Sequence, residues 1–180
     1  MEKKSQCQND LFLFSKPKPL KALFIELEIV IGLVTFYWKE KLKMAESKNA
    51  RYIKLLDDLD KRELLEGAED YLKKLRSEGV LISLGSASKN APLILEKLGI
   101  ADLFDSIVDG NSVSKSKPDP EVFLKAAQML NLSPVECCVF DDSQAGIEAA
   151  RRAGCSVIAV DKGDVLKCAD KYVKCLGDLL

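Results

Sequence analysis

Residues 136–146 read Glu-Cys-Cys-Val-Phe-Asp-Asp-Ser-Gln-Ala-Gly, a short apolar run that ends on two adjacent acids. The run 137–140 predicts a buried strand. Ser143 is a favourable helix N-cap, and apolar residues follow it at helical spacing. Asp141 and Asp142 therefore stand where a strand passes into a helix. In an open α/β sheet this is the edge at which ligands bind.

Two carboxylates side by side repel each other, and a bound cation relieves that repulsion. Oxygen ligands that leave room for water suit magnesium, so Asp141 and Asp142 are candidate Mg²⁺ ligands. An acidic pair at a helix N-terminus also interacts favourably with the helix dipole and need not bind anything. From these residues alone, that alternative stays open.

Composition narrows the function classes. The chain has 180 residues, enough for one domain with a full core. Hydrophobic residues make up 47% and charged residues 31%, and the net charge of -1 gives no indication of a nucleic-acid partner. The sequence has no histidine, which excludes Ser-His-Asp triads, Cys-His pairs and zinc motifs that contain histidine.

The six cysteines form no C-x-x-C pair, and we interpret them as small core residues in a reducing compartment. The uncharged stretch 29–38 is too short to span a bilayer. No small-residue cleavage site follows it. We therefore expect a cytoplasmic protein without a membrane partner.

Strand and helix patterns alternate from residue 21 onward. The predicted strands are 21–31, 80–84, 106–108, 137–140, 156–160 and 172–173. The predicted helices are 39–59 (or a helical hairpin), 68–75, one with Pro92 in its first turn, 122–130, one capped by Ser143, and a short one near 165–168. This alternation predicts a parallel sheet covered by helices on both faces.

Polar groups follow four of the predicted strands, and right-handed crossovers place these groups at one edge of the sheet. They are Glu26 and Glu28; Ser86, Ser88, Lys89 and Asn90; Lys117; and Asp141 and Asp142. The small-residue loop 85–90 lets backbone N–H groups approach an anion at a helix N-terminus. A serine-rich loop is more often a plain turn, and a lysine before proline is more often exposed. Together, however, hydroxyls, lysine and magnesium-binding carboxylates describe a phosphate site.

Several motifs resemble those of the haloacid dehalogenase superfamily, in particular its β-phosphoglucomutase-like phosphosugar enzymes. Residues 65–67, Leu-Glu-Gly, look like that family's Leu-Pro-Gly. Residues 86–90, Ser-Ala-Ser-Lys-Asn, match its second motif, and 116–120, Ser-Lys-Pro-Asp-Pro, match its third. Residues 141–146 resemble the fourth. The likeness is dense from about 64 to 161, and it implies a Rossmann-like α/β core of the haloacid dehalogenase type.

The resemblance also implies residue roles. Ser86 would hold the transferring phosphoryl group, and Lys117 would stabilise its charge and orient the nucleophile. Asp142 would be the direct Mg²⁺ ligand, with Asp141 supporting it. The residues near a substrate phosphate would be Ala87, Ser88, Lys89 and Asn90. The implied partner is a small phosphorylated metabolite, a sugar phosphate, and the implied cofactor is Mg²⁺.

The family's first motif, Asp-x-Asp-Gly, is replaced by Glu26-Leu27-Glu28-Ile29. By resemblance Glu26 would be the nucleophile and Glu28 the general acid/base, both beside the metal. The extra methylene moves each carboxylate by ~1 Å, which can cost ~10²-fold in rate. Ile29 stands where glycine is expected and resists positive φ. Alternatively, Glu26 and Glu28 are strand acids without a catalytic role.

The resemblance implies a helical cap after the first motif, but only residues 32–61 are available for it. We assign 1–20 to a tail, 21–31 and 62–180 to the core, and 32–61 to a truncated cap. A less covered site favours hydrolysis over mutase chemistry. We expect a magnesium-dependent phosphosugar mutase or phosphatase of impaired activity. The alternatives are an inactive relative that keeps the phosphate and magnesium pocket, and a truncated gene product.

Overall fold

A parallel six-stranded sheet forms the centre of the molecule. A computed structural model describes residues 20–30, 59–161 and 165–180. The strand order is β3-β2-β1-β4-β5-β6, and every neighbouring pair is parallel. The strands are β1 (Ala22–Ile25), β2 (Leu81–Gly85), β3 (Ser106–Val108), β4 (Cys137–Asp141), β5 (Ser156–Val160) and β6 (Lys171–Val173). Their carboxyl ends therefore meet at one edge, as the sequence predicts.

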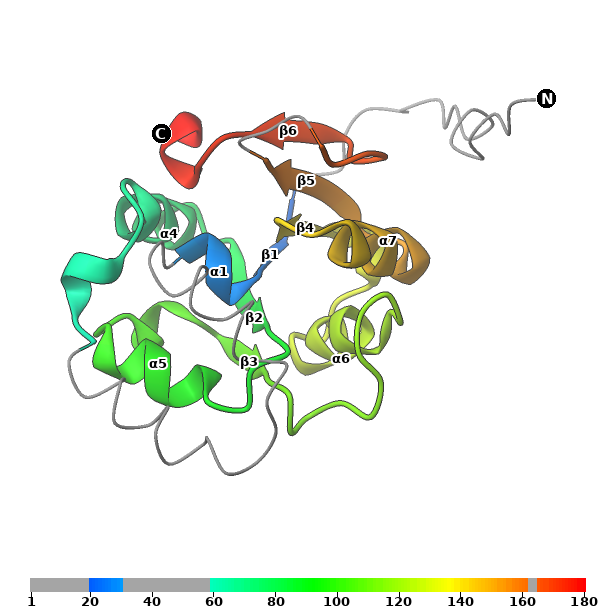
Figure 1. Cartoon of the computed structure of the whole chain (residues 1–180), viewed down its shortest axis with the longest axis horizontal. Coiled ribbons are helices and arrows are strands. Elements are labelled where there is room, and N and C mark those ends of the chain that lie inside the picture. The colour runs from blue at the N-terminus through cyan, green and yellow to red at the C-terminus, as the bar shows by residue number, and fades with distance from the viewer. Residues whose placement is uncertain (1–19, 31–58, 162–164) are drawn as a thin grey trace.

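Helices cover both faces of this sheet (Figure 1). They are α1 (Leu27–Val30), α4 (Ala68–Ser77), α5 (Ala91–Lys97), α6 (Glu121–Met129) and α7 (Gln144–Ala153). Helices α1, α4 and α5 lie on one face, and α6 and α7 lie on the other. Alternate residues of β1 enter the two cores, with Leu23 and Ile25 on the α4 side and Phe24 on the α6 side. The predicted two-sided α/β architecture is confirmed.

The predicted strand 21–31 is wrong beyond residue 25. The chain leaves β1 at Glu26 and enters α1 at once, and the Ile29 N–H donates to the Glu26 carbonyl at 3.2 Å. Glu26 and Glu28 are therefore not two strand residues that share a face. Leu27, Ile29 and Val30 are buried, and such a short apolar run is compatible with either element.

The short helix predicted near 165–168 is also wrong. The Asp161 carboxylate accepts from the Val165 and Leu166 N–H groups, both at 2.7 Å, and Cys168 has a φ of 66°. This segment is irregular and leads directly into β6. Nearly all of the predicted helix 39–59, of the predicted tail 1–20 and of the predicted cap 32–61 lies outside the described residues.

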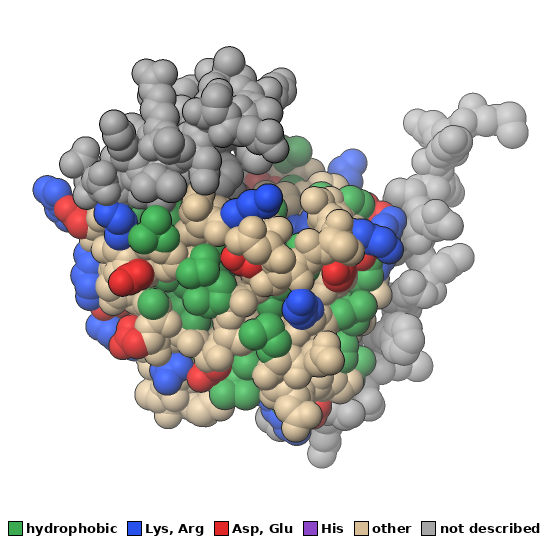
Figure 2. All heavy atoms as spheres, turned by 90° about the horizontal axis from the view of Figure 1, so that it is seen from below, with side chains coloured by type: hydrophobic (Ala, Val, Ile, Leu, Met, Phe, Trp, Pro, Cys, Tyr) green, Lys and Arg blue, Asp and Glu red, His purple; other side chains and the backbone are tan. Residues whose placement is uncertain are grey.

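The surface carries no concentration of one charge on the face shown in Figure 2, where basic, acidic and hydrophobic side chains are interspersed. Within the described ranges, no helix is long and apolar enough to cross a bilayer. Cys137, Cys138 and Cys155 are buried free thiols, as predicted for core residues. The prediction is wrong for two others, because Cys175 is only half-buried and Cys168 is disulfide-bonded. Cys7 lies outside the described residues.

Candidate active site

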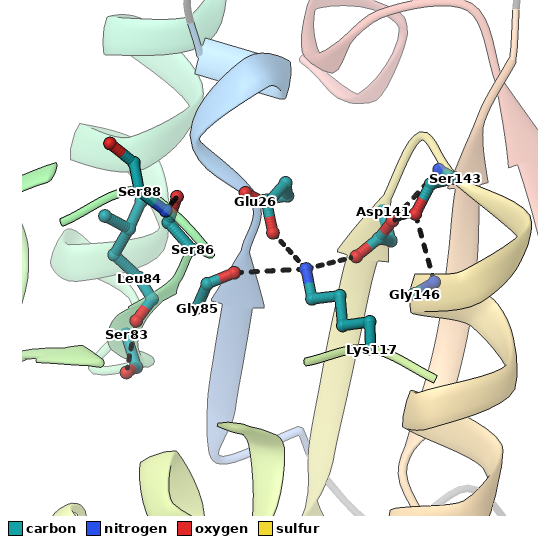
Figure 3. Close-up of polar contacts among 10 residues, drawn as sticks. All are labelled: Glu26, Ser83, Leu84, Gly85, Ser86, Ser88, Lys117, Asp141, Ser143 and Gly146. Carbon is teal, nitrogen blue, oxygen red and sulfur yellow. Dashed lines mark hydrogen bonds and ion pairs between the residues drawn. The ribbon is translucent and has the colours of Figure 1, made fainter. Parts of the chain in front are cut away.

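The ammonium of Lys117 joins three strand ends (Figure 3). Its Nζ contacts Glu26 Oε2, lies 2.8 Å from Asp141 Oδ2 and donates to the Gly85 carbonyl at 3.2 Å. Glu26 follows β1, Asp141 ends β4 and Gly85 ends β2. Asp141 is fully buried, Glu26 is 5% exposed and the Lys117 side chain is 12% exposed. A cation and two carboxylates therefore meet where little of any of the three side chains is accessible to solvent.

Burial favours the neutral form of Lys117 and lowers its pKa. Attraction from Glu26 and Asp141 outweighs burial, so the pKa of the ammonium is held above its usual value. The ring of Phe123 lies under this ammonium, with 5.1 Å from Nζ to the ring centroid, and stacks on Phe24 at 6.3 Å. Lys117 therefore stays positively charged and packs on an aromatic ring of the core, and its charge suits interaction with an anion.

The Asp141 carboxylate is fixed by the start of α7. Its Oδ1 accepts from the Ser143 N–H at 2.9 Å and from Ser143 Oγ at 2.7 Å. It lies directly over Gly146, where a Cβ would be 1.9 to 2.0 Å from the three carboxylate atoms. The space that this carboxylate fills is therefore open because residue 146 has no side chain. The helix N-terminus also favours the negative charge.

The loop after β2 forms a second wall. Ser86 is 2% exposed, and its Oγ accepts from the Ser88 N–H at 3.1 Å. Ser88 Oγ accepts in turn from the Asn90 N–H at 3.2 Å. A pocket of about 250 Å³ separates this loop from the Lys117 loop and is lined by Ser86, Ala87, Lys89, Gly110, Val113, Ser114, Lys115, Ser116, Lys117 and Val122. The lining has lysines but no acid, which suits an anionic ligand.

Asp142 adds a third carboxylate to this edge. Burial, followed by repulsion from Asp141 and Glu26, raises the pKa of Asp142 to about 6 against the attraction of Lys117. This excess of negative charge and the hard oxygen donors fit a divalent cation such as Mg²⁺. In the described part of the chain, no three Asp, Glu, His or Cys side chains form a metal cage by themselves. Magnesium commonly uses one or two carboxylates plus water and substrate oxygens, so the residues still fit it.

The structure brings most of the predicted site residues to one edge. Those at the edge are Glu26, Ser86, Ala87, Ser88, Lys89, Asn90, Lys117, Asp141 and Asp142. Lys89 is exposed in the pocket lining, and Asn90 precedes α5. Glu28 lies in α1, but its side chain falls outside what the structure describes. Their roles in binding, metal ligation and catalysis stay predictions.

Sequence reasoning missed three contributors: the Gly85 carbonyl, the space at Gly146 and Asp109. Asp109 follows β3 at the same edge, and its buried carboxylate organises the next turn. The rule that singled out Asp141, an acid where a strand ends, also applies to Asp109. The Gly85 contact had no sequence signal, because it depends on a lysine 32 positions away.

The chain is similar in sequence to known proteins. A family model described as haloacid dehalogenase-like hydrolase matches residues 14–154. The β-phosphoglucomutase of Bacillus subtilis is 41% identical over 140 residues, which cover 78% of this chain and 62% of that protein. The phosphorylated carbohydrates phosphatase of Thermotoga maritima is 31% identical over 75% of this chain and 59% of its own length. The chain thus spans about six tenths of these curated relatives.

Solved structures share the fold. The β-phosphoglucomutase of Clostridium difficile superposes with a TM-score of 0.79 at 29% identity, covering 89% of this chain and 93% of that one. Rhodobacter sphaeroides CbbY, crystallised with xylulose-(1,5)bisphosphate, gives a TM-score of 0.73 over 89% of this chain and 96% of that one. At 15% identity the CbbY match shows the fold alone.

Proposed function

The chain belongs to the haloacid dehalogenase-like hydrolases, and on that premise we propose that it transfers the phosphoryl group of a small sugar phosphate in the cytoplasm with Mg²⁺ as cofactor. The observation that carries this proposal is the contact of Lys117 with Glu26 and Asp141 beside the Ser86 loop. A charged ammonium next to a carboxylate and hydroxyl groups suits a phosphate monoester, because phosphoryl transfer depends on positioning and electrostatic stabilisation.

In the proposed reaction the Glu26 carboxylate attacks phosphorus and the ester P–O bond breaks. The departing alkoxide takes a proton from Glu28, and the phosphoryl group stays on Glu26 as an acyl phosphate. Glu28 then accepts a proton from water, whose oxygen attacks phosphorus. The P–O bond to Glu26 breaks, which releases inorganic phosphate and regenerates the Glu26 carboxylate. Lys117 and the Ser86 hydroxyl would hold the phosphoryl oxygens throughout.

Asp142 and Glu26 are the side chains that would hold magnesium, with Asp141 oriented behind them by Ser143. When bound, the ion would neutralise charge on the phosphoryl oxygens. The relatives named for sugar phosphates support that substrate class. We favour hydrolysis over mutase chemistry, because the segment 32–61 offers few residues for a cap that excludes water.

The experiment is turnover of p-nitrophenyl phosphate with and without Mg²⁺. We expect slow, magnesium-dependent hydrolysis that Glu26→Gln abolishes and Asp142→Asn reduces at least tenfold, since even residues that only support a metal ligand typically contribute ~10- to 100-fold. Glu78→Gln is the matched control, because Glu78 is an exposed acid that follows α4 and precedes the amino end of β2, at the sheet edge opposite the site. Activity that survives Glu26→Gln would contradict the proposed nucleophile.

A second candidate is a phosphate-binding relative without turnover. It is favoured by the glutamates that replace the first-motif aspartates and by the direct contact of Glu26 with Lys117. The double variant Glu26→Asp, Glu28→Asp separates the two candidates. If only the shortened side chains turn over substrate, with a gain of ~10²-fold or more, the parent chain is the binding form and its pocket is intact.

A further inference from the structure

Asp109 is a buried acid that the reaction proposed above does not use. It follows β3 and is 9% exposed. Its Oδ1 accepts from the Asn111 N–H at 3.1 Å and from Ser112 Oγ at 2.7 Å, and its Oδ2 accepts from Asn111 Nδ2 at 3.0 Å. These bonds outweigh the effect of burial and keep the pKa of Asp109 below its ordinary value. The charged carboxylate thus closes the turn 109–112.

That turn contacts the loop that carries Ser86. The Gly110 N–H donates to the Ser88 carbonyl at 3.2 Å, and Asn111 Nδ2 also donates to the Lys89 carbonyl at 3.3 Å. A Cβ on Gly110 would lie 2.3 Å from the Ala87 carbonyl oxygen, so the two backbones touch. The turn therefore holds the outer side of the Ser86 loop along three successive residues.

The Ser86 loop depends on such support because it belongs to no helix or strand. The Ser86 N–H is held by the Val108 carbonyl at 2.9 Å, and beyond Ser86 the loop's own side-chain bonds are local: Ser88 N–H to Ser86 Oγ, and Asn90 N–H to Ser88 Oγ. In both bonds the hydroxyl is the acceptor, so its hydrogen can point to an anion. The loop backbone determines the positions of these hydroxyls, and the 109–112 turn contacts that backbone.

We propose that Asp109 is a positioning residue for the phosphate-binding loop: through Asn111 and Gly110 it fixes the backbone of residues 87–89 and thereby the anion-binding groups of Ser86 and Ser88. The inference rests on the proposed function, because it deepens the role given to that loop. Asp109 touches neither phosphate nor metal in this scheme, and its contribution passes through the turn.

The test measures the affinity of the folded protein for inorganic phosphate in the presence of Mg²⁺ by titration calorimetry. Asp109→Ala should weaken phosphate binding on the order of tenfold, since misplacement of ~1 Å can cost ~10²-fold at such sites. Asp109→Asn keeps an acceptor for the Asn111 N–H and should recover part of the loss. Asn111→Ala should give an intermediate loss, because it removes the side-chain bonds to the Lys89 carbonyl and to Asp109 Oδ2 but keeps both bonds to Asp109 Oδ1.

Asp105 supplies the matched control. It stands before β3, as Asp109 stands after it, and its carboxylate accepts from the Ile82 N–H at 2.8 Å and pairs with Arg76. Asp105→Ala should lower the urea midpoint without changing phosphate affinity. If Asp109→Ala and Asp105→Ala change phosphate affinity equally, or neither changes it, the positioning role is overturned.

The two proposals fail separately. A parent chain that binds phosphate but does not hydrolyse p-nitrophenyl phosphate removes the catalytic proposal, and the affinity comparison still decides the role of Asp109. A parent chain that binds no phosphate overturns both. Weaker binding in Asp109→Ala with normal binding in Asp105→Ala supports the inference, whatever the turnover.

Discussion

The ends of β1 and β4 make an instructive pair. The strands are neighbours with Ile25 opposite Phe140, and the Glu26 N–H continues the ladder to the Phe140 carbonyl at 3.2 Å. Each strand delivers an acid to the same edge and then passes into a helix. Helix α7 has ten residues and a serine cap, whereas α1 has four.

The two acids are held in different ways. Both acids contact Lys117, but Asp141 is also held by residues two to five positions ahead, through bonds from Ser143 and the space at Gly146. Glu26 is held by an ion pair with Lys117, which lies 91 positions away. The β4 end is thus specified locally, whereas the β1 end depends on the tertiary fold. Substitutions should expose this difference.

Lys117→Met should have the largest effect, because it leaves the buried carboxylates of Glu26 and Asp141 without their cation. We expect a loss of about 3–5 kcal/mol in the free energy of unfolding, measured by urea denaturation. The matched control is Lys115→Met, whose side chain is 68% exposed and lies 3.4 Å from Asp119. That change should cost less than ~1 kcal/mol. Equal losses in the two variants would contradict a buried ionic junction.

Burial, followed by repulsion from Asp141 and Glu26 at the two strand ends, raises the pKa of Asp142 to about 6. The folded state then binds more protons than the unfolded state between about pH 4 and 6, so stability falls as the pH rises through this window. In metal-free protein, the stability of Asp142→Asn relative to the parent should therefore increase as the pH rises through this window. The increase should be at most about 3 kcal/mol, and less with solvent screening. A stability difference between the two proteins that does not change with pH would contradict the raised pKa of Asp142.

Gly146→Ala tests the local design of the β4 end. The new Cβ would lie 1.9 to 2.0 Å from the Asp141 carboxylate atoms, so we expect a loss of about 1–3 kcal/mol although alanine favours helices. The sharper measurement is a double-mutant cycle with Asp141→Ala. Once the carboxylate is gone, Gly146→Ala should become neutral or stabilising. If its cost persists in the Asp141→Ala background, the clash is with something else.

The same contrast explains what the sequence could predict. The β4 end was predicted to within one residue, 140 against Asp141, because strand run, acids, cap and helix spacing are adjacent in the chain. Beyond residue 25 the β1 end was predicted wrongly, because the apolar residues Leu27, Ile29 and Val30 fit a buried strand as well as a buried helix. The end of this helix is held by a distant residue, since the Leu65 N–H donates to the Val30 carbonyl. The sheet edge was predictable from strand ends, but the three-way contact of Lys117 was not.

Ser143→Ala should have the smallest effect, and it isolates the cap from the charge. Ser143 Oγ accepts from the Gly146 N–H at 3.0 Å and donates to Asp141 Oδ1 at 2.7 Å. Loss of an N-cap hydroxyl typically costs about 1 kcal/mol, and Ser143→Thr should restore most of it. Because the Ser143 N–H still holds Asp141 at 2.9 Å, the carboxylate should stay in place. Magnesium affinity should therefore change less than stability, whereas a parallel loss of both would mean that the hydroxyl, and not the backbone, positions the acid.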